Sequence, residues 1–222
     1  MRTTILSAAL LIWLVLSGPA KADLIVNGSF EAPVIPNGTQ KTFTGTQIPG
    51  WTIIGGGANA QIFNTTYQEL GTTFNAKAGV QSVDVSGTTN FSGQGLSQTV
   101  PTVSGVTYEL SFYVGNPDGF NPISGAVVDL SINGGPPVPF VNTDVTPGFI
   151  NWKHFTVDFT ATGSSTTLDF TYGSAPPNVV AALDNVSLNA VPEPASLTLL
   201  GVGLIGGVVG CAYRRRKDAT RR

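Results

Sequence analysis

The chain has 222 residues, of which 41% are hydrophobic and only 11% charged, and its formal net charge is −2. That net charge hides a segregation, because residues 23–190 contain eleven acidic residues and only three lysines, which gives this region a charge of −8. Nucleic-acid binding needs clustered Lys and Arg, so this composition excludes it for residues 23–190. The single cysteine, Cys211, lies outside this region and therefore cannot stabilise it with a disulfide.

The first 22 residues have the pattern of a secretory signal peptide. Arg2 provides a positive start, residues 5–16 form an apolar stretch, and Ala20-Lys21-Ala22 has the small-x-small pattern of a cleavage site. The apolar stretch is short for a transmembrane helix. We therefore expect an exported mature chain that begins near Asp23.

Residues 23–190 are predicted to form one all-β domain. Short runs of alternating apolar and polar residues recur between turn residues, which is typical of strands with one buried face. In chain order the expected strands lie near 24–26, 51–54, 61–63, 81–85, 96–100, 106–114, 128–132, 154–159, 168–172 and 182–188. Since no segment resembles a crossover helix, these strands should pair antiparallel in a two-sheet sandwich. Jelly-roll and immunoglobulin-like topologies both fit this pattern.

The C-terminal residues 191–222 combine three features in a fixed order. Pro192-Glu193-Pro194 comes first, a nearly uncharged run over 195–213 follows, and a basic tail over 214–222 begins with Arg214, Arg215 and Arg216. A helix over 195–213 would span roughly 28 Å, close to the ~30 Å of a hydrocarbon core. The arginines should stay on the cytoplasmic side of the membrane.

This order of features resembles the PEP-CTERM sorting signal of Gram-negative bacteria. The resemblance implies that an exosortase recognises Pro192-Glu193-Pro194 and processes the chain nearby, while the helix anchors the precursor in the inner membrane. The mature form is then expected at the cell envelope or surface, or secreted. An ordinary C-terminal membrane anchor is the alternative.

The domain itself carries a second resemblance, in four short motifs. They are Asn27-Gly-Ser-Phe-Glu31, Pro49-Gly-Trp51, Gly105-x-x-Tyr-x-Leu-x-Phe112 and Ala182-Leu-Asp-Asn-Val-Ser-Leu188. In this order they resemble galactose-binding-like jelly rolls, among them choice-of-anchor exported domains, and are similar to several carbohydrate-binding modules. The resemblance favours the jelly roll over the immunoglobulin-like topology and implies a binding module.

The same resemblance implies a structural calcium ion, with Glu31 and Asp184 as ligands. The sequence gives a separate reason to examine Asp184, because in a regular strand it shares a face with Ala182 and Val186. A buried carboxylate needs hydrogen-bond donors or a cation. The alternative is that Asp184 accepts backbone N–H bonds at a bulge.

Three aromatic residues are candidates for stacking against a sugar ring. Phe63 and Tyr67 lie in the region 59–71, which we interpret as a loop able to present a ligand surface, and Trp152 has the parity of the polar face of its strand. Trp51 follows Pro-Gly and is expected in the core instead. The lone histidine, His154, is predicted at the surface.

We therefore predict an exported, non-enzymatic module that binds carbohydrate or exopolysaccharide. One alternative is a purely structural surface or biofilm protein with no discrete ligand. Another is a glycan hydrolase, which would need two carboxyl groups converging in one cleft. A single histidine supports neither a catalytic triad nor a zinc site.

Overall fold

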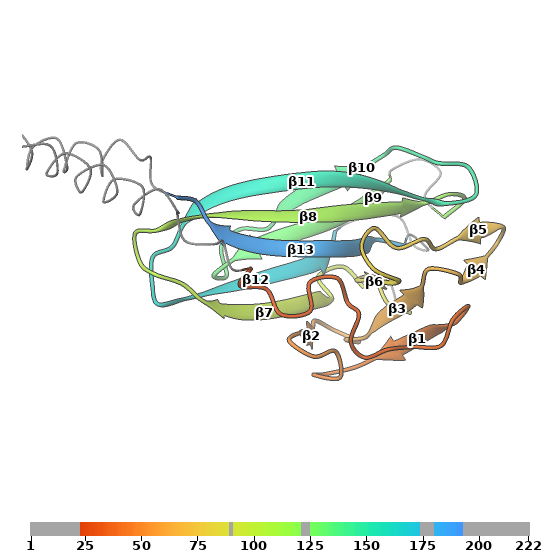
Figure 1. The fold of residues 1–222 in the computed structure, drawn as a ribbon, viewed down its shortest axis with the longest axis horizontal. Coiled ribbons are helices and arrows are strands. Elements are labelled where there is room, and N and C mark those ends of the chain that lie inside the picture. Colours follow the sequence, from red (N-terminus) through yellow and green to blue (C-terminus); the bar gives the residue numbers. More distant parts are fainter. Residues whose placement is uncertain (1–22, 89–90, 121–124, 174–179, 193–222) are drawn as a thin grey trace, which may run out of the picture. The chain divides into compact units, whose positions relative to one another are not determined.

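The computed structural model describes residues 23–88, 91–120, 125–173 and 180–192 (Figure 1). Residues 23–190 belong to one compact unit, and only this unit is analysed below. No helix among the described residues is long and apolar enough to cross a membrane. The expected signal peptide, the helix over 195–213, the residues Glu193 and Pro194 and the basic tail lie outside the described residues.

Two antiparallel sheets make up the domain, which confirms the predicted all-β sandwich of the jelly-roll class. The six-stranded sheet has the order β1 (Gln40–Phe43), β3 (Ala60–Asn64), β6 (Gln81–Asp84), β13 (Ala182–Ala190), β8 (Thr107–Pro117), β11 (Ile150–Thr160). The five-stranded sheet has the order β10 (Val138–Asn142), β9 (Ala126–Ile132), β12 (Ser165–Tyr172), β7 (Gly95–Pro101), β2 (Thr52–Ile54). A small hairpin of β4 (Gln68–Glu69) and β5 (Thr72–Thr73) stands apart from both.

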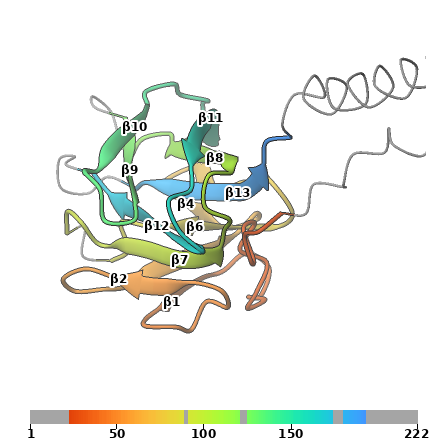
Figure 2. The ribbon, with the colours of Figure 1, turned by 90° about the vertical axis from the view of Figure 1, so that its left-hand side faces the viewer.

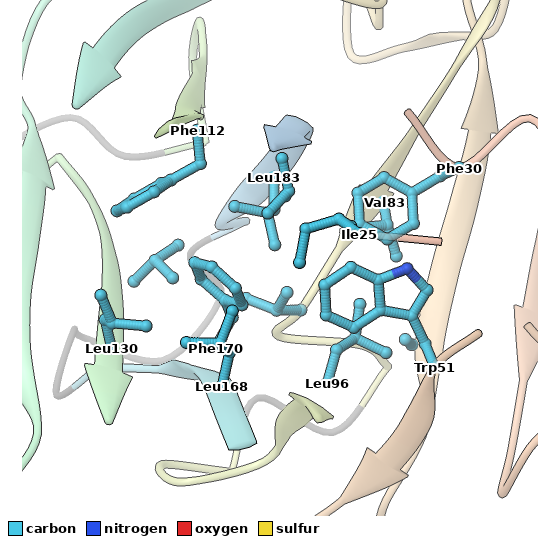
Figure 3. Close-up of a cluster of buried hydrophobic side chains, with 14 of the residues drawn as sticks. Ile25, Phe30, Trp51, Val83, Leu96, Phe112, Leu130, Leu168, Phe170 and Leu183 are labelled. Atoms are coloured by element: carbon cyan, nitrogen blue, oxygen red, sulfur yellow. The ribbon is translucent and has the colours of Figure 1, made fainter. Parts of the chain in front are cut away.

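The core lies between the two sheets and follows from the alternation in the sequence. Tyr108, Leu110 and Phe112 of β8 are buried, whereas the residues between them face outward. Figure 3 shows buried side chains from both sheets pointing toward one another, with Phe170 in the middle of the cluster.

Trp51 belongs to this core, as predicted. Its side chain is 2% exposed, and its ring centroid lies 5.4 Å from that of Phe30 and 6.1 Å from that of Phe170. Its indole N–H donates to the carbonyl oxygen of Asn27, 3.1 Å away. The Pro-Gly-Trp motif therefore fixes the N-terminal segment against the sandwich.

The segment 24–26 does not form the regular strand that its sequence predicts. Leu24 donates one backbone hydrogen bond to Leu188 of β13, over 3.0 Å. Farther along, the side chain of Gln98 binds both the N–H and the carbonyl of Val26, at 2.8 and 3.0 Å. An amide side chain thus occupies the place that a neighbouring strand would take.

One end of the six-stranded sheet is covered on its outer face as well. Here a second apolar cluster, separate from the main core, combines Phe63, Phe74, Ile150 and Ala182, with Trp152 packed against it. Phe74 comes from the segment 65–80, which crosses this face and contains the β4–β5 hairpin. This covered region positions the candidate site.

Candidate functional site

A cavity of about 410 Å³ opens beside this second cluster, on the outer face of the six-stranded sheet. Gln61 of β3 and Asp84 of β6 line it and are direct partners across the two strands. The rest of the lining consists of Phe63 of β3, Glu69 of β4 and loop residues that include Thr88 and Phe120. Amide, carboxylate and hydroxyl groups thus converge on one small space with an aromatic ring beside them.

Asp84 is the buried acid of this cavity. Its carboxylate is 1% exposed and accepts hydrogen bonds from the N–H of Ser86 at 2.9 Å, the hydroxyl of Ser86 at 2.7 Å and the N–H of Ala181 at 3.2 Å. These bonds favour the charged form, but burial outweighs them and raises the pKa of Asp84 to about 7. The group can therefore hold or release a proton near neutral pH.

The aromatic floor of the cavity is more deeply buried than the sequence suggested. Phe63 belongs to strand β3 and is 2% exposed, so the prediction of a loop aromatic at the surface is wrong for this residue. Its ring centroid lies 4.4 Å from that of Phe74 and 5.4 Å from that of Tyr67. Phe63 nevertheless lines the cavity from below.

Tyr67 packs against the second apolar cluster and is partly buried. Its hydroxyl donates to the carboxylate of Glu69 over 2.9 Å. Burial, and then this neighbouring carboxylate, raise the pKa of Tyr67 to about 12, so the phenol stays protonated as a donor. The hydrogen bond orients Glu69, which lines the cavity.

Trp152 lies on the outer face, as its parity predicts, but it does not line the same cavity. Its side chain is half-buried against the second apolar cluster, and its indole N–H donates to the carbonyl of Asn75 over 2.9 Å. Gly115 and Ala182 separate it from Asp84 in the row of strand partners. Trp152 thus shares the second apolar cluster with Phe63 and Tyr67 but does not line the cavity.

The two predicted calcium ligands bind the same short loop, residues 77–81. The fully buried carboxylate of Asp184 accepts the N–H groups of Lys77 and Ala78 at 2.7 and 2.9 Å. Glu31 accepts the N–H groups of Val80 and Gln81, both at 2.8 Å. Burial, together with the negative charge of Glu31, raises the pKa of Asp184 to about 7.

Hydrogen bonding at a bulge, the alternative considered for Asp184, is also present. The pairing of β13 with β8 shifts register between Asp184 and Ser187, and Asp184 accepts the N–H of Asn185 at 2.6 Å. The described residues contain no group of three or more His, Cys, Asp or Glu side chains suited to a metal ion. A calcium ion beside Glu31 and Asp184 would therefore need backbone carbonyls and water as further ligands.

The sequence analysis missed Asp84, Gln61 and Glu69 as site residues. The alternation in the predicted strand 81–85 does indicate the position of Asp84. Val83 and Val85 are apolar and define the core face of this strand, so Asp84 lies on the opposite face. No local pattern indicates that the segment 65–80 folds back over this face. The cavity depends on that long-range contact.

These features define an all-β sandwich with a polar cavity on the outer face of one sheet. The chain belongs to the HpiC1-like family, because the family described as HpiC1 cyclase matches residues 22–188. Residues 190–217 match the PEP-CTERM protein-sorting motif. This second match confirms the predicted sorting signal and implies export, sorting at the cell envelope and processing by an exosortase.

The chain is also similar to solved structures at low sequence identity. The Stig cyclase Fisc from Fischerella sp. TAU, crystallised with (3Z)-3-(1-methyl-2-pyrrolidinylidene)-3H-indole, has a TM-score of 0.57 and 19% identity, with 79% of this chain and 100% of that chain covered. The CBM22-1 xylan-binding domain of Paenibacillus barcinonensis Xyn10C has a TM-score of 0.45 and 21% identity, with 80% and 100% covered. No match was found among curated proteins.

Proposed function

We propose that this exported sandwich binds carbohydrate, of the exopolysaccharide class, in the cavity beside Asp84. The observation that carries the proposal is the lining, in which Gln61, Glu69 and Asp84 surround a floor that contains Phe63. Sugar hydroxyls pair with amide and carboxylate groups, and the C–H face of a sugar ring packs on an aromatic side chain. A cavity of about 410 Å³ lies within the usual range of small-molecule sites, which favours one or two sugar units over a long chain.

The cavity lies near the start of β13, away from the end of this strand that leads into the sorting motif, and this position favours a ligand site that stays accessible. Asp84 pairs with Ala182 at the start of β13, whereas Ala190 ends the strand next to the sorting motif. At about 3.3 Å per residue, these two ends of β13 are roughly 26 Å apart. A polymer bound in the cavity would thus stay clear of the point where the chain leaves the domain.

Calcium has a structural part in this proposal. Glu31 and Asp184 hold the loop 77–81 from two sides, and burial disfavours the charged form of Asp184, whose pKa is raised to about 7. A calcium ion bound by both carboxylates would compensate that charge. Its role would be to fix the loop and, through it, the covered region beside the cavity.

A second candidate function is acid catalysis on a ring compound. Asp84 favours it, because a carboxyl group with a pKa of about 7 in a partly aromatic cavity can donate a proton at neutral pH. Membership of a family described as a cyclase points the same way. The first proposal remains the non-enzymatic one, since an amide and two carboxylates suit hydroxyl recognition without any chemical step.

A glycan array probed with residues 23–190, in calcium and in chelator, tests the first proposal. We expect saturable binding to a small set of glycans that survives in Asp84→Asn, because the amide keeps its hydrogen-bonding capacity. A glycan consumed over time by the wild type but not by Asp84→Asn would favour the catalytic function. No saturable binding to any glycan would favour a purely structural surface protein.

A further inference from the structure

The cavity beside Asp84 contains two carboxylates and no positively charged side chain. Asp84 and Glu69 both line it, and its other described lining residues are neutral. Residues 23–190 contain three lysines, one histidine and no arginine, so few side chains in the domain can carry a positive charge. None of these four residues lines the cavity.

The three lysines lie elsewhere on the domain. β1, which contains Lys41, and β11, which contains Lys153, are opposite edges of the six-stranded sheet, at the bottom and the top of Figures 1 and 2. Lys41 pairs with the core residue Ile62, so its side chain leaves the sheet on the face opposite the cavity. Nζ of Lys77 lies 4.6 Å from the ring centroid of Tyr113. The acids of the cavity therefore have no lysine beside them.

One oxygen of Asp84 is available to a ligand. The three hydrogen bonds that Asp84 accepts, two from Ser86 and one from Ala181, all end on Oδ1. No described residue donates a hydrogen bond to Oδ2, although Asp84 is only 1% exposed and lines the cavity. A buried polar atom normally has a partner, so a ligand that brings a donor to Oδ2 is favoured.

The other polar side chains of the cavity are also rich in acceptors. Only one carboxylate oxygen of Glu69 receives a hydrogen bond from a described residue. The hydroxyl of Thr88 donates to Asn59, which leaves its own lone pairs available. The amide nitrogen of Gln61 donates to Gln40, whereas its amide oxygen accepts from no described residue. A ligand with several hydrogen-bond donors on one atom therefore matches this cavity.

Two phenylalanine rings add a surface that attracts positive charge. Phe63 and Phe120 line the cavity, and both pack on Phe74, with ring centroids 4.4 and 5.4 Å from its own. The face of an aromatic ring is electrostatically negative and attracts a cation within about 6 Å. A primary ammonium group is a cation with three donors and no acceptor, so it suits the carboxylates, the free acceptors and the rings together.

We propose that the glycan bound in this cavity carries free, protonated amino groups, as in an amino sugar without N-acetylation. This inference rests on the proposed carbohydrate function and specifies the class of sugar. The ammonium group donates to Oδ2 of Asp84, and Glu69 adds a second negative charge to the same cavity. N-acetylation removes the positive charge and leaves one N–H beside a carbonyl oxygen, which the carboxylates repel. The charge of −8 on residues 23–190 also attracts a cationic glycan.

Matched pairs of glucosamine and galactosamine oligosaccharides, each as the free amine and as its N-acetylated form, test this inference. Residues 23–190 are suitable for the titrations, because this segment contains its own core. We expect the wild type to bind the free-amine member of a pair at least about tenfold more tightly than the acetylated one.

Variants that remove one negative charge test where the preference arises. Glu69→Gln keeps an acceptor for Tyr67 and should lower the affinity for the free amine about fivefold, with no change for the acetylated form. Asp84→Asn should still bind glycan but lose most of the preference for the amine. Asp158→Asn, which removes one exposed charge on β11, is the matched control and should bind like the wild type.

Equal or tighter binding of the acetylated members by the wild type would overturn the inference and leave the carbohydrate proposal in place. No saturable binding to any glycan would overturn both. Equal losses of affinity in Glu69→Gln and Asp158→Asn would also overturn the inference, because they would indicate attraction to an acidic surface without a site. So would a preference that survives unchanged in both Glu69→Gln and Asp84→Asn while their melting temperatures stay normal.

Discussion

Two buried carboxylates, Asp84 and Asp184, lie on the outer face of the six-stranded sheet and titrate near neutral pH. Burial is the first cause of the raised pKa of each, which moves from 3.8 to about 7. A pKa that is higher in the folded than in the unfolded chain stabilises the fold at low pH. This contribution is complete below about pH 4 and is lost as the pH rises through 7.

The first prediction concerns this pH dependence. In chelator, residues 23–190 should melt at a higher temperature at pH 5 than at pH 8, and a shift of about three pKa units corresponds to up to about 4 kcal/mol for one group. Asp84→Asn should flatten the profile of melting temperature against pH. A domain that gains stability between pH 5 and pH 8 would contradict this assignment.

The second prediction separates the two acids by their response to calcium. An ion at about 100 times its Kd adds roughly 2.7 kcal/mol to the folded state, so chelator should lower the melting temperature at pH 8. Asp184→Asn should abolish most of that response. Asp84→Asn should keep it, because Asp84 does not contact the loop 77–81. The calcium hypothesis fails if a sample verified to be metal-free melts like the calcium-loaded one.

At the scale of elements, the second apolar cluster supports the segment 65–80 and with it one side of the cavity. Trp152 is partly buried there and donates a hydrogen bond to Asn75. The third prediction is that Trp152→Ala lowers the free energy of unfolding by about 2–3 kcal/mol, through lost packing and one lost hydrogen bond. Denaturant unfolding measures it, with His154→Ala on the same strand as an exposed control. Equal stability of the two variants would show that this cluster carries little stability.

The strands that could be predicted are those with one face in the core and one in solvent. The alternating stretches 128–132, 154–159 and 168–172 lie within β9, β11 and β12, and the stretch 106–114 begins one residue before β8. The short edge strands β1 and β10 were missed, because few of their residues are buried. The prediction near 24–26 failed since a side chain, that of Gln98, meets the backbone there.

The candidate site was harder to predict because both faces of β3 and β6 are buried around it. All four residues of β6 are buried, including Asp84 on the outer face, so the polar and apolar residues of its sequence do not correspond to exposed and buried positions. Phe63 was placed at the surface because the region 59–71 was interpreted as a loop, whereas Phe63 belongs to β3. Glu31 and Asp184, in contrast, were linked through the resemblance of their motifs, and the structure shows both holding the loop 77–81.

The family match and the sorting motif cover adjacent parts of the chain. The family match ends at residue 188 and the sorting match begins at residue 190, so almost no linker separates them. The fourth prediction is that replacing Pro192-Glu193-Pro194 by alanines leaves a longer, unprocessed protein in the inner membrane. Cell fractionation with mass measurement checks this. The same mature mass and surface location in wild type and variant would refute the sorting role of these three residues.

We propose that the outer-face cavity recognises a carbohydrate. Isothermal titration of residues 23–190 with the glycan that binds best on the array tests it most directly. Gln61→Ala should weaken binding at least about tenfold by removing a polar group that lines the cavity, while Thr156→Ala, on the outer face of β11, should bind like the wild type. Equal affinity of wild type and Gln61→Ala, with both proteins folded, would show that the ligand binds elsewhere.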